Sequence, residues 1–292
     1  MKKIFYSLAI ALVALMVSIP AKAAASKYFV NDYEDFKLVF RYRLAPNNAP
    51  LQSGDTVQLI VDINQTYNSS QDVFDVRSGQ VLTLDLNGHT IQYDATASAA
   101  LQLLSIREGA TFNIIDTKGG GQFILNDHDG TGQTMLFAVE KNATINVYGG
   151  SLLCWYNNVG WSKCKAIYTL GSGVVVNIYD GLISSIRGNN HNYANTQINI
   201  YGGTIGTEAF LSPSYDAALW HSPFEGTIKG GKIYGLFGTA ALADYRPAGY
   251  PEANIDKALA ENTKVYIDGV RTPSNQLVSE RDAYENKLVE GF

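Results

Sequence analysis

The chain has 292 residues, a formal net charge of −5, 17% charged residues, 27 glycines and 18 tyrosines. That length is ample for a sizeable core, and abundant glycine with sparse charge suits an all-β chain with many tight turns. An acidic chain without a basic patch is a poor match for nucleic acid, so we set nucleic-acid binding aside.

Residues 1–23 are typical of a bacterial signal peptide. Lys2 and Lys3 precede an apolar run over 4–19, and Ala21-Lys22-Ala23 forms a small-x-small cleavage site. The run is shorter than the roughly 20 residues that span a bilayer. The sequence therefore predicts export to the periplasm, the cell surface or the medium, with no integral membrane segment left. Cleavage takes three of the 22 basic residues and none of the 27 acidic ones, which leaves a net charge of −8.

Residues 24–80 are predicted to form an N-terminal cap and a first coil. Residues 27–30 form a short strand, and Asn31 or Asp32 can N-cap a helix over 34–42, where the apolar spacing is helical. Prolines at 46 and 50 end the helix, and a strand is predicted at 58–62. An amphipathic helix is the expected cover for the open core end of a solenoid.

One phrase occurs three times, at 145–152, 176–183 and 198–205, as Ile-Asn-Val-Tyr-Gly-Gly-Ser-Leu and two close variants. Each copy is a β-branched strand with alternating polarity, closed by a glycine turn and followed by another apolar pair. Weaker copies lie near 84–91, 112–116, 228–233 and 265–270. Such repeats indicate a solenoid whose coils bury their apolar faces against one another. The predicted solenoid covers 81–270, and 271–292 forms a C-terminal tail or cap.

A family resemblance rests on four features of the sequence. They are the first strand, the capping helix, the strand entry Gly54-Asp-Thr-Val57 and the stretch Leu82–Ile91. Over roughly 27–270 the chain resembles the pectin-lyase-like superfamily. The resemblance implies an all-β fold: a right-handed, single-stranded parallel β-helix with an N-terminal capping helix. The general preference for right-handed parallel crossovers agrees. The superfamily contains polysaccharide lyases, glycoside hydrolases, phage tailspikes and adhesins, so the resemblance implies architecture rather than one chemistry.

Alternation along each strand predicts two outward rows of side chains. Ile145 and Val147 face the core, so their neighbours face outward. One predicted row contains Asp85, Asn113, Asn146, Asn177 and Asn199, and the other contains Asn87, Ile115, Tyr148, Tyr179 and Tyr201. Two interpretations are open. Either the amides form a ladder and the tyrosines stack on one another, or pyranose rings rest on tyrosine faces while sugar hydroxyls meet the amides.

The segment between Cys154 and Cys164 contains Trp155, Tyr156 and Trp161. In an exported chain, two cysteines ten residues apart predict a disulfide, and the alternative is two buried free thiols. Three aromatic side chains are costly to expose unless they are packed or used. They either pack on the flank of the coil or are held rigid by the disulfide for glycan contact.

The sequence contains few candidate catalytic residues. Asp216, His221 and Glu225 could supply acid–base chemistry, and neighbouring coils could pair Asp116 or Asp180 with another carboxylate, as glycoside hydrolysis requires. The hydrolase motifs of the superfamily are missing, however, so no catalytic residue is assigned.

No metal or other cofactor is predicted, with Ca²⁺ as the one alternative left open. The outward rows contain mostly amides, which make a weak calcium site. The stretch Asp127-His-Asp-Gly-Thr-Gly132 superficially resembles a calcium loop, but it lacks the leading Asp and the distal Glu.

The sequence favours an exported, non-catalytic β-helix whose partner is a polysaccharide or a cell-surface glycan. A polysaccharide lyase or glycoside hydrolase with an atypical site is the first alternative. A structural adhesin that binds protein partners is the second.

Overall fold

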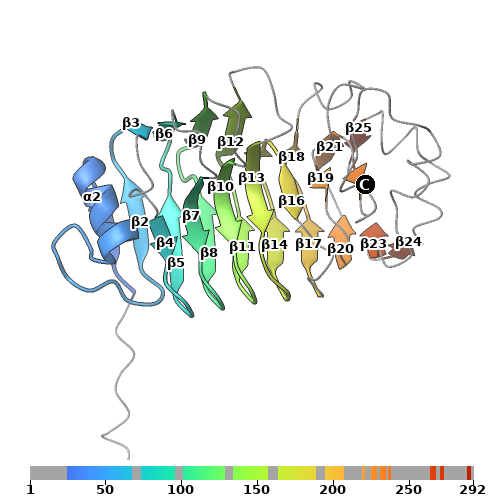
Figure 1. The fold of residues 1–292 in the computed structure, drawn as a ribbon, viewed down its shortest axis with the longest axis horizontal. Coiled ribbons are helices and arrows are strands. Elements are labelled where there is room, and N and C mark those ends of the chain that lie inside the picture. The colour runs from blue at the N-terminus through green and yellow to red at the C-terminus, as the bar shows by residue number, and fades with distance from the viewer. Residues whose placement is uncertain are drawn as a thin grey trace, which may run out of the picture.

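The computed structural model describes residues 25–67, 74–95, 101–128, 134–156, 164–188 and 195–206, and short segments at 219–220, 225–228, 231–234, 236–237, 264–267, 270–272 and 288–290. The chain is an all-β parallel solenoid, as predicted (Figure 1). Each coil, meaning one full turn of the solenoid, contributes one strand to each of three sheets. The helices of the described residues are α2 (Tyr33–Lys37) and the π-helix η1 (Leu38–Tyr42).

Three sheets run along the length of the solenoid. The first contains β1 (Lys27–Val30), β2 (Thr56–Leu59), β5 (Val81–Asp85), β8 (Thr111–Ile115), β11 (Thr144–Val147), β14 (Val175–Ile178), β17 (Gln197–Ile200), β20 (Glu225–Ile228), β23 (Lys264–Ile267) and β24 (Val270–Thr272). The second contains β4 (Phe74–Val76), β7 (Gln102–Ile106), β10 (Thr134–Val139), β13 (Cys164–Thr169), β16 (Ile186–Gly188), β19 (Leu219–Trp220) and β22 (Leu236–Phe237). The third contains β3 (Ile63–Tyr67), β6 (Thr90–Ala95), β9 (Gln122–Asp127), β12 (Ser151–Tyr156), β15 (Leu182–Ile183), β18 (Thr204–Ile205), β21 (Lys232–Tyr234) and β25 (Leu288–Glu290).

The helical cap forms where it was predicted. The Asp32 side chain accepts a hydrogen bond from the Asp35 backbone N–H and so begins α2. Phe36 of α2 and Phe40 of η1 are fully buried. The Phe36 ring lies 5.0 Å from that of Phe74 on β4, so the helix closes the core at the first coil.

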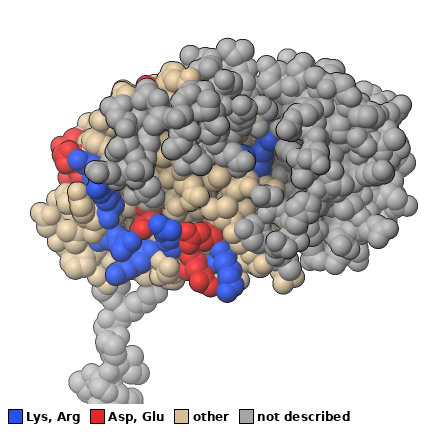
Figure 2. Space-filling model, viewed as in Figure 1, with Lys and Arg blue, Asp and Glu red and all other residues tan. Residues whose placement is uncertain are grey.

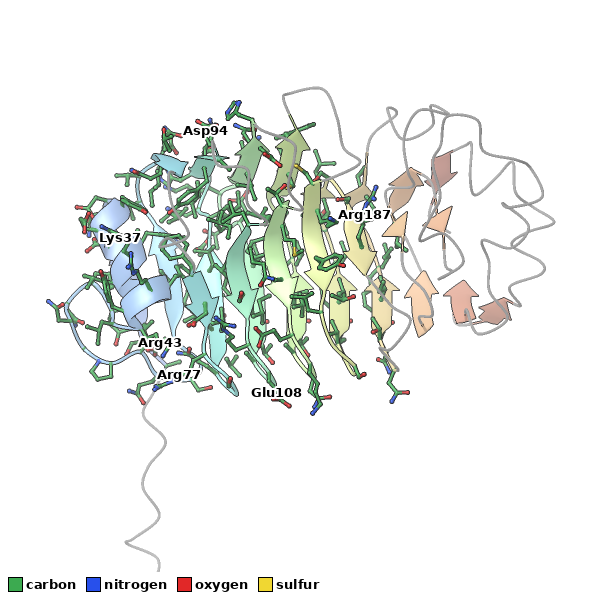
Figure 3. The ribbon with its side chains drawn as sticks, viewed as in Figure 1. Lys37, Arg43, Arg77, Asp94, Glu108 and Arg187 are labelled. Carbon is green, nitrogen blue, oxygen red and sulfur yellow. The ribbon has the colours of Figure 1, made fainter. Side chains whose placement is uncertain are left out.

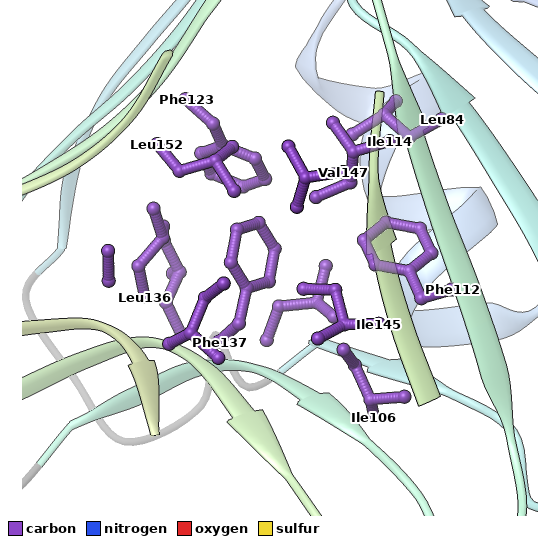
Figure 4. Close-up of a cluster of buried hydrophobic side chains, with 14 of the residues drawn as sticks. Leu84, Ile106, Phe112, Ile114, Phe123, Leu136, Phe137, Ile145, Val147 and Leu152 are labelled. Atoms are coloured by element: carbon purple, nitrogen blue, oxygen red, sulfur yellow. The ribbon is translucent and has the colours of Figure 1, made fainter. Parts of the chain in front are cut away.

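The repeated phrases stack in register. Ile145 lies opposite Val176, Asn146 lies opposite Asn177, and β14 pairs with β17 in the same way. The aliphatic members of each pair point inward and are fully buried, as the alternation predicts. Figure 4 shows part of the resulting core, where Ile145 and Val147 lie near the ring of Phe137.

Glycines form a column at the corner between the first and third sheets. Gly150, Gly181, Gly203 and Gly231 have φ values of +83°, +104°, +78° and +86°. A Cβ added at Gly203 would lie 2.7 Å from the carbonyl oxygen of Gly181. The glycine turn in the repeated phrase is therefore required by the backbone conformation and by the close approach of successive coils.

Candidate functional site

The outer face of the first sheet carries a stack of three tyrosines. Tyr148, Tyr179 and Tyr201 follow β11, β14 and β17 and are 46%, 40% and 39% exposed. The ring centroids of Tyr148 and Tyr179 are 4.6 Å apart with an interplanar angle of 5°, and those of Tyr179 and Tyr201 are 4.9 Å apart at 13°. The predicted mutual stacking is confirmed. Because both faces of the Tyr179 ring are covered by its neighbours, this tyrosine offers its edge and hydroxyl end to a ligand, and no pyranose can stack on its face.

The asparagines beside this stack form the predicted amide ladder. Asn146 Nδ2 donates to Asn113 Oδ1 at 2.8 Å, and Asn177 Nδ2 donates to Asn146 Oδ1 at 2.8 Å. Asn199 Nδ2 continues the row to Asn177 Oδ1 at 2.9 Å. An asparagine side chain has two N–H donors and two lone pairs. Each amide within the ladder therefore keeps a second N–H and a second lone pair for other partners.

The predicted rows are wrong at Asp85 and Asn87. Thr83 lies opposite Asn113 and Asp85 lies opposite Ile115, so Asp85 falls in the tyrosine row. The glycine turn after β5 comes two residues later than in the repeated phrase: the Leu86 N–H still bonds to the Ile115 carbonyl of the following coil, and Gly88 comes two residues after it. Asp85 is buried, and its carboxylate accepts hydrogen bonds from Gln58, Asn87 and Thr117. Asn87 is also buried and donates to the Leu59 carbonyl.

The outward side chains of β8, β11, β14 and β17 and of the tyrosine stack are all uncharged, and we call this area the neutral face. Its members alternate with fully buried aliphatic or aromatic residues. They are Thr111, Asn113, Ile115, Thr144, Asn146, Tyr148, Val175, Asn177, Tyr179, Gln197, Asn199 and Tyr201.

Charged residues instead gather along an edge of the solenoid. Figure 2 shows blue and red atoms together on the lower rim, and Figure 3 labels Arg43 and Glu108 there. Arg43 makes two bonds to Asp75, of 3.0 and 2.8 Å, and Arg107 Nη1 lies 2.6 Å from Glu140. These pairs link successive coils, so their charges are largely compensated.

The environment of Tyr148 raises the pKa of its hydroxyl. Burial raises the pKa of its hydroxyl, and the adjacent Tyr179 raises the pKa further by charge repulsion and by a hydrogen bond. Like an ordinary tyrosine hydroxyl, this group is protonated at neutral pH and can both donate and accept.

The predicted disulfide is wrong, because Cys154 and Cys164 are free thiols in the core. The Cys164 thiol donates to the Trp155 carbonyl oxygen at 2.9 Å and lies 3.0 Å from Thr134 Oγ1. Burial raises the pKa of Cys154 well above its ordinary value, and the neighbouring Cys164 adds to this. Disulfide formation requires a thiolate, and this apolar site disfavours one.

The other predicted aromatic contacts are only partly described. Trp155 is half-buried on β12 and packs against the core cluster. Tyr156 ends β12, but its side chain lies outside the described residues, as does the whole of Trp161. Glycan contact by these three residues stays a prediction.

The acids considered for catalysis hold turn backbones where they are described. Asp116 accepts hydrogen bonds from the N–H groups of Gly88 and Gly121, both at 2.7 Å. Asp180 accepts from the N–H of Gly181 at 2.7 Å. Asp216, His221 and the side chain of Glu225 lie outside the described residues.

No metal centre is found in the described part of the chain, which holds no group of three or more His, Cys, Asp and Glu placed to bind an ion. Asp127, the first acid of the calcium-like stretch, is buried and accepts a hydrogen bond from Thr134 at 3.1 Å. The part of that stretch from 129 to 132 is not described.

A polar cluster on the outside of the third sheet was not predicted. Asp94 Oδ1 lies 2.7 Å from Asn126 Nδ2 and 3.2 Å from His128 Nε2, and Gln92 also donates to the carboxylate (Figure 3). Burial opposes ionisation of Asp94, but hydrogen bonds from Asn126, His128 and Gln92 hold its pKa below the usual value. In register, Asn126 lies between Asp94 and Trp155. The polar alternation within 90–95 and 122–127 was the available signal.

Comparisons with protein-family models, with curated proteins and with solved structures gave no match. Among the residues described, no helix has both the length and the apolar character needed to cross a membrane. Any function must therefore be argued from the geometry of the chain itself.

Proposed function

We propose that this chain is an exported, non-catalytic glycan-binding solenoid whose ligand contacts the neutral face. The observation that carries the proposal is the exposed row of Tyr148, Tyr179 and Tyr201 beside the amide ladder. Contiguous exposed aromatic surface marks an interaction site, and the hydroxyls and amides beside it can exchange hydrogen bonds with sugar hydroxyls.

The binding groups are already ordered. Each tyrosine ring is held by stacking and each asparagine by its ladder bonds, so little side-chain freedom remains to be lost when a ligand binds. The tyrosine hydroxyls and the second N–H and lone pair of each amide recur once per coil. Such a repeat suits a polymer whose hydroxyl groups also recur. Contact through ring edges replaces the contact through ring faces expected from the sequence.

Three further parts of the proposal have separate support. The signal-peptide pattern of residues 1–23 supports export. The N-terminal cap and the parallel coils support membership of the pectin-lyase-like superfamily, and with the general crossover preference they support a right-handed winding. Trp155, Tyr156 and Trp161, on or after β12, would extend the glycan contact.

The test is retention of purified protein on an immobilised polysaccharide panel. We expect Tyr148→Ala/Tyr179→Ala/Tyr201→Ala to weaken retention by at least about tenfold. The control Gln92→Ala, on the third sheet and two coils from Trp155, should bind as the parent does. The proposal fails if the triple variant keeps its circular dichroism spectrum and its melting temperature and still binds.

A second variant separates two contributions to binding. Tyr148→Phe/Tyr179→Phe/Tyr201→Phe keeps the stacked rings and removes only the hydroxyls. If edge-on hydrogen bonding dominates, this variant should lose nearly as much retention as the alanine variant. Release of reducing or unsaturated ends in the same incubations would instead assign an enzyme, and capture of a protein in the absence of sugar would favour an adhesin.

A further inference from the structure

We infer that the ligand of the neutral face is a neutral polysaccharide and that anionic polysaccharides are rejected. This inference rests on the proposed function and narrows it to one chemical class. It begins from the twelve outward side chains of the neutral face, which include no Lys, Arg or His. Proteins that recognise carboxylate or sulfate groups do so mainly through Arg and Lys.

The charges that border the neutral face do not supply this recognition. Lys141, in the turn before β11, pairs with Glu108 at 3.1 Å. Asp180, beside Tyr179, is exposed and adds negative charge at the border. Arg107, in the turn before β8, is paired with Glu140 at 2.6 Å. Lys118, after β8, is the remaining cation in the described turns that directly flank these strands. With a net charge of −5 on the whole chain, an anionic polymer is repelled on approach.

The hydrogen-bonding groups of the neutral face match hydroxyls. A tyrosine hydroxyl and a ladder amide each offer both a donor and an acceptor. A sugar hydroxyl does the same, so the contacts can be satisfied without burying a charge. A carboxylate or sulfate placed on the stack would lose water and gain no cation, which is costly.

The experiment compares polymers that share a backbone and differ in charge. Retention is measured on hydroxyethyl cellulose against carboxymethyl cellulose, and on dextran against dextran sulfate. We expect the parent protein to be retained on at least one neutral polymer and to bind its anionic counterpart at least about tenfold more weakly.

A matched pair of variants tests whether the missing cations cause the rejection. Thr144 and Val175 are half-buried neighbours in register on the neutral face and lie outside the tyrosine and asparagine rows. Thr144→Lys/Val175→Lys should gain retention on the anionic polymer, and added salt should abolish the gain. Thr144→Glu/Val175→Glu alters the same positions and should gain none.

The outcomes separate the inference from the proposed function. Equal retention of both members of a pair, or retention of the anionic member alone, overturns the inference and leaves glycan binding in place. A folded lysine variant without the gain also overturns it, because electrostatics would then not be the cause. If the parent protein binds no polymer, the proposed function and the inference fail together.

Discussion

The first coils and the later coils differ in where their stacked aromatic residues lie: in the core of the solenoid in the first coils, and on its outer surface in the later ones. From the cap to β10 the described core contains large rings that contact one another: Phe36, Phe40, Phe74, Tyr93, Phe112, Phe123 and Phe137. From β11 to β18 the described interior is lined mainly by aliphatic side chains, while Tyr148, Tyr179 and Tyr201 stack outside. The same residue class thus fills the core at one end and supports a surface at the other.

Strand length also changes along the solenoid. In the third sheet β9 and β12 have six residues each, whereas β15 and β18 have two. In the second sheet, β13 has six residues and β16 has three. The coil of β11, β12 and β13 nevertheless has long strands and carries Tyr148, so strand length alone does not set the change. The exposed tyrosine stack lies on coils whose described core is mainly aliphatic.

The largest expected effect is the loss of an inner ring. Phe137 lies 5.9 Å from Phe112 and 5.2 Å from Phe123, centroid to centroid, and is fully buried. Phe137→Ala should lower the free energy of unfolding by about 3–5 kcal/mol, because it leaves a cavity. The outer counterpart, Tyr179→Ala, should cost only about 0.5–1.5 kcal/mol per lost ring pair. Denaturant titration measures both, and equal losses would contradict the comparison.

A smaller effect is expected at the glycine corner of the later coils. Gly181 has a φ of +104°, and an added Cβ would collide with the carbonyl oxygen of Gly150. Gly181→Ala should destabilise the fold by about 2–4 kcal/mol, since backbone strain and overpacking add. Gly79, in the first coils, has a φ of +69° and nothing within 4 Å of an added Cβ. Gly79→Ala should therefore cost only about 1 kcal/mol, and a larger loss there would show that steric crowding does not distinguish the two sites.

The smallest effect concerns the ionisation of the outer stack. Since the pKa of Tyr148 is raised in the folded protein, the folded state holds this proton more tightly than the unfolded state. The resulting stability is fully present below the unfolded pKa of about 10 and is lost as the pH rises through the folded pKa. Alkaline titration followed by phenolate absorbance should show a late component that Tyr148→Phe removes. If the titration curve does not change in that variant, Tyr148 is not the perturbed group.

The parts of the fold predicted from sequence are those that repeat. The phrases around Asn146, Asn177 and Asn199 each specify a strand, the side of the strand that faces outward, and the glycine turn. Aligning the phrases therefore predicts both the amide ladder and the tyrosine stack. Asp85 was misplaced because its turn glycine comes two residues late, and only backbone pairing shows which residues align. The spacing of Cys154 and Cys164 predicted a disulfide, but both residues are buried free thiols. The Asp94 cluster joins unlike strands 32 residues apart, and no repeated phrase marks it.

The ends of the solenoid bear on whether one chain can stack on another. A parallel stack of coils has no intrinsic last member, because each coil presents backbone N–H and C=O groups that another coil of any chain can extend. Here β24 pairs with β23 and β25 pairs with β21 in the antiparallel sense, and α2 with η1 plugs the opposite end of the core. Antiparallel strands at one end of the first and third sheets, and a helix across the core at the other end, disfavour the addition of further parallel coils from a second chain.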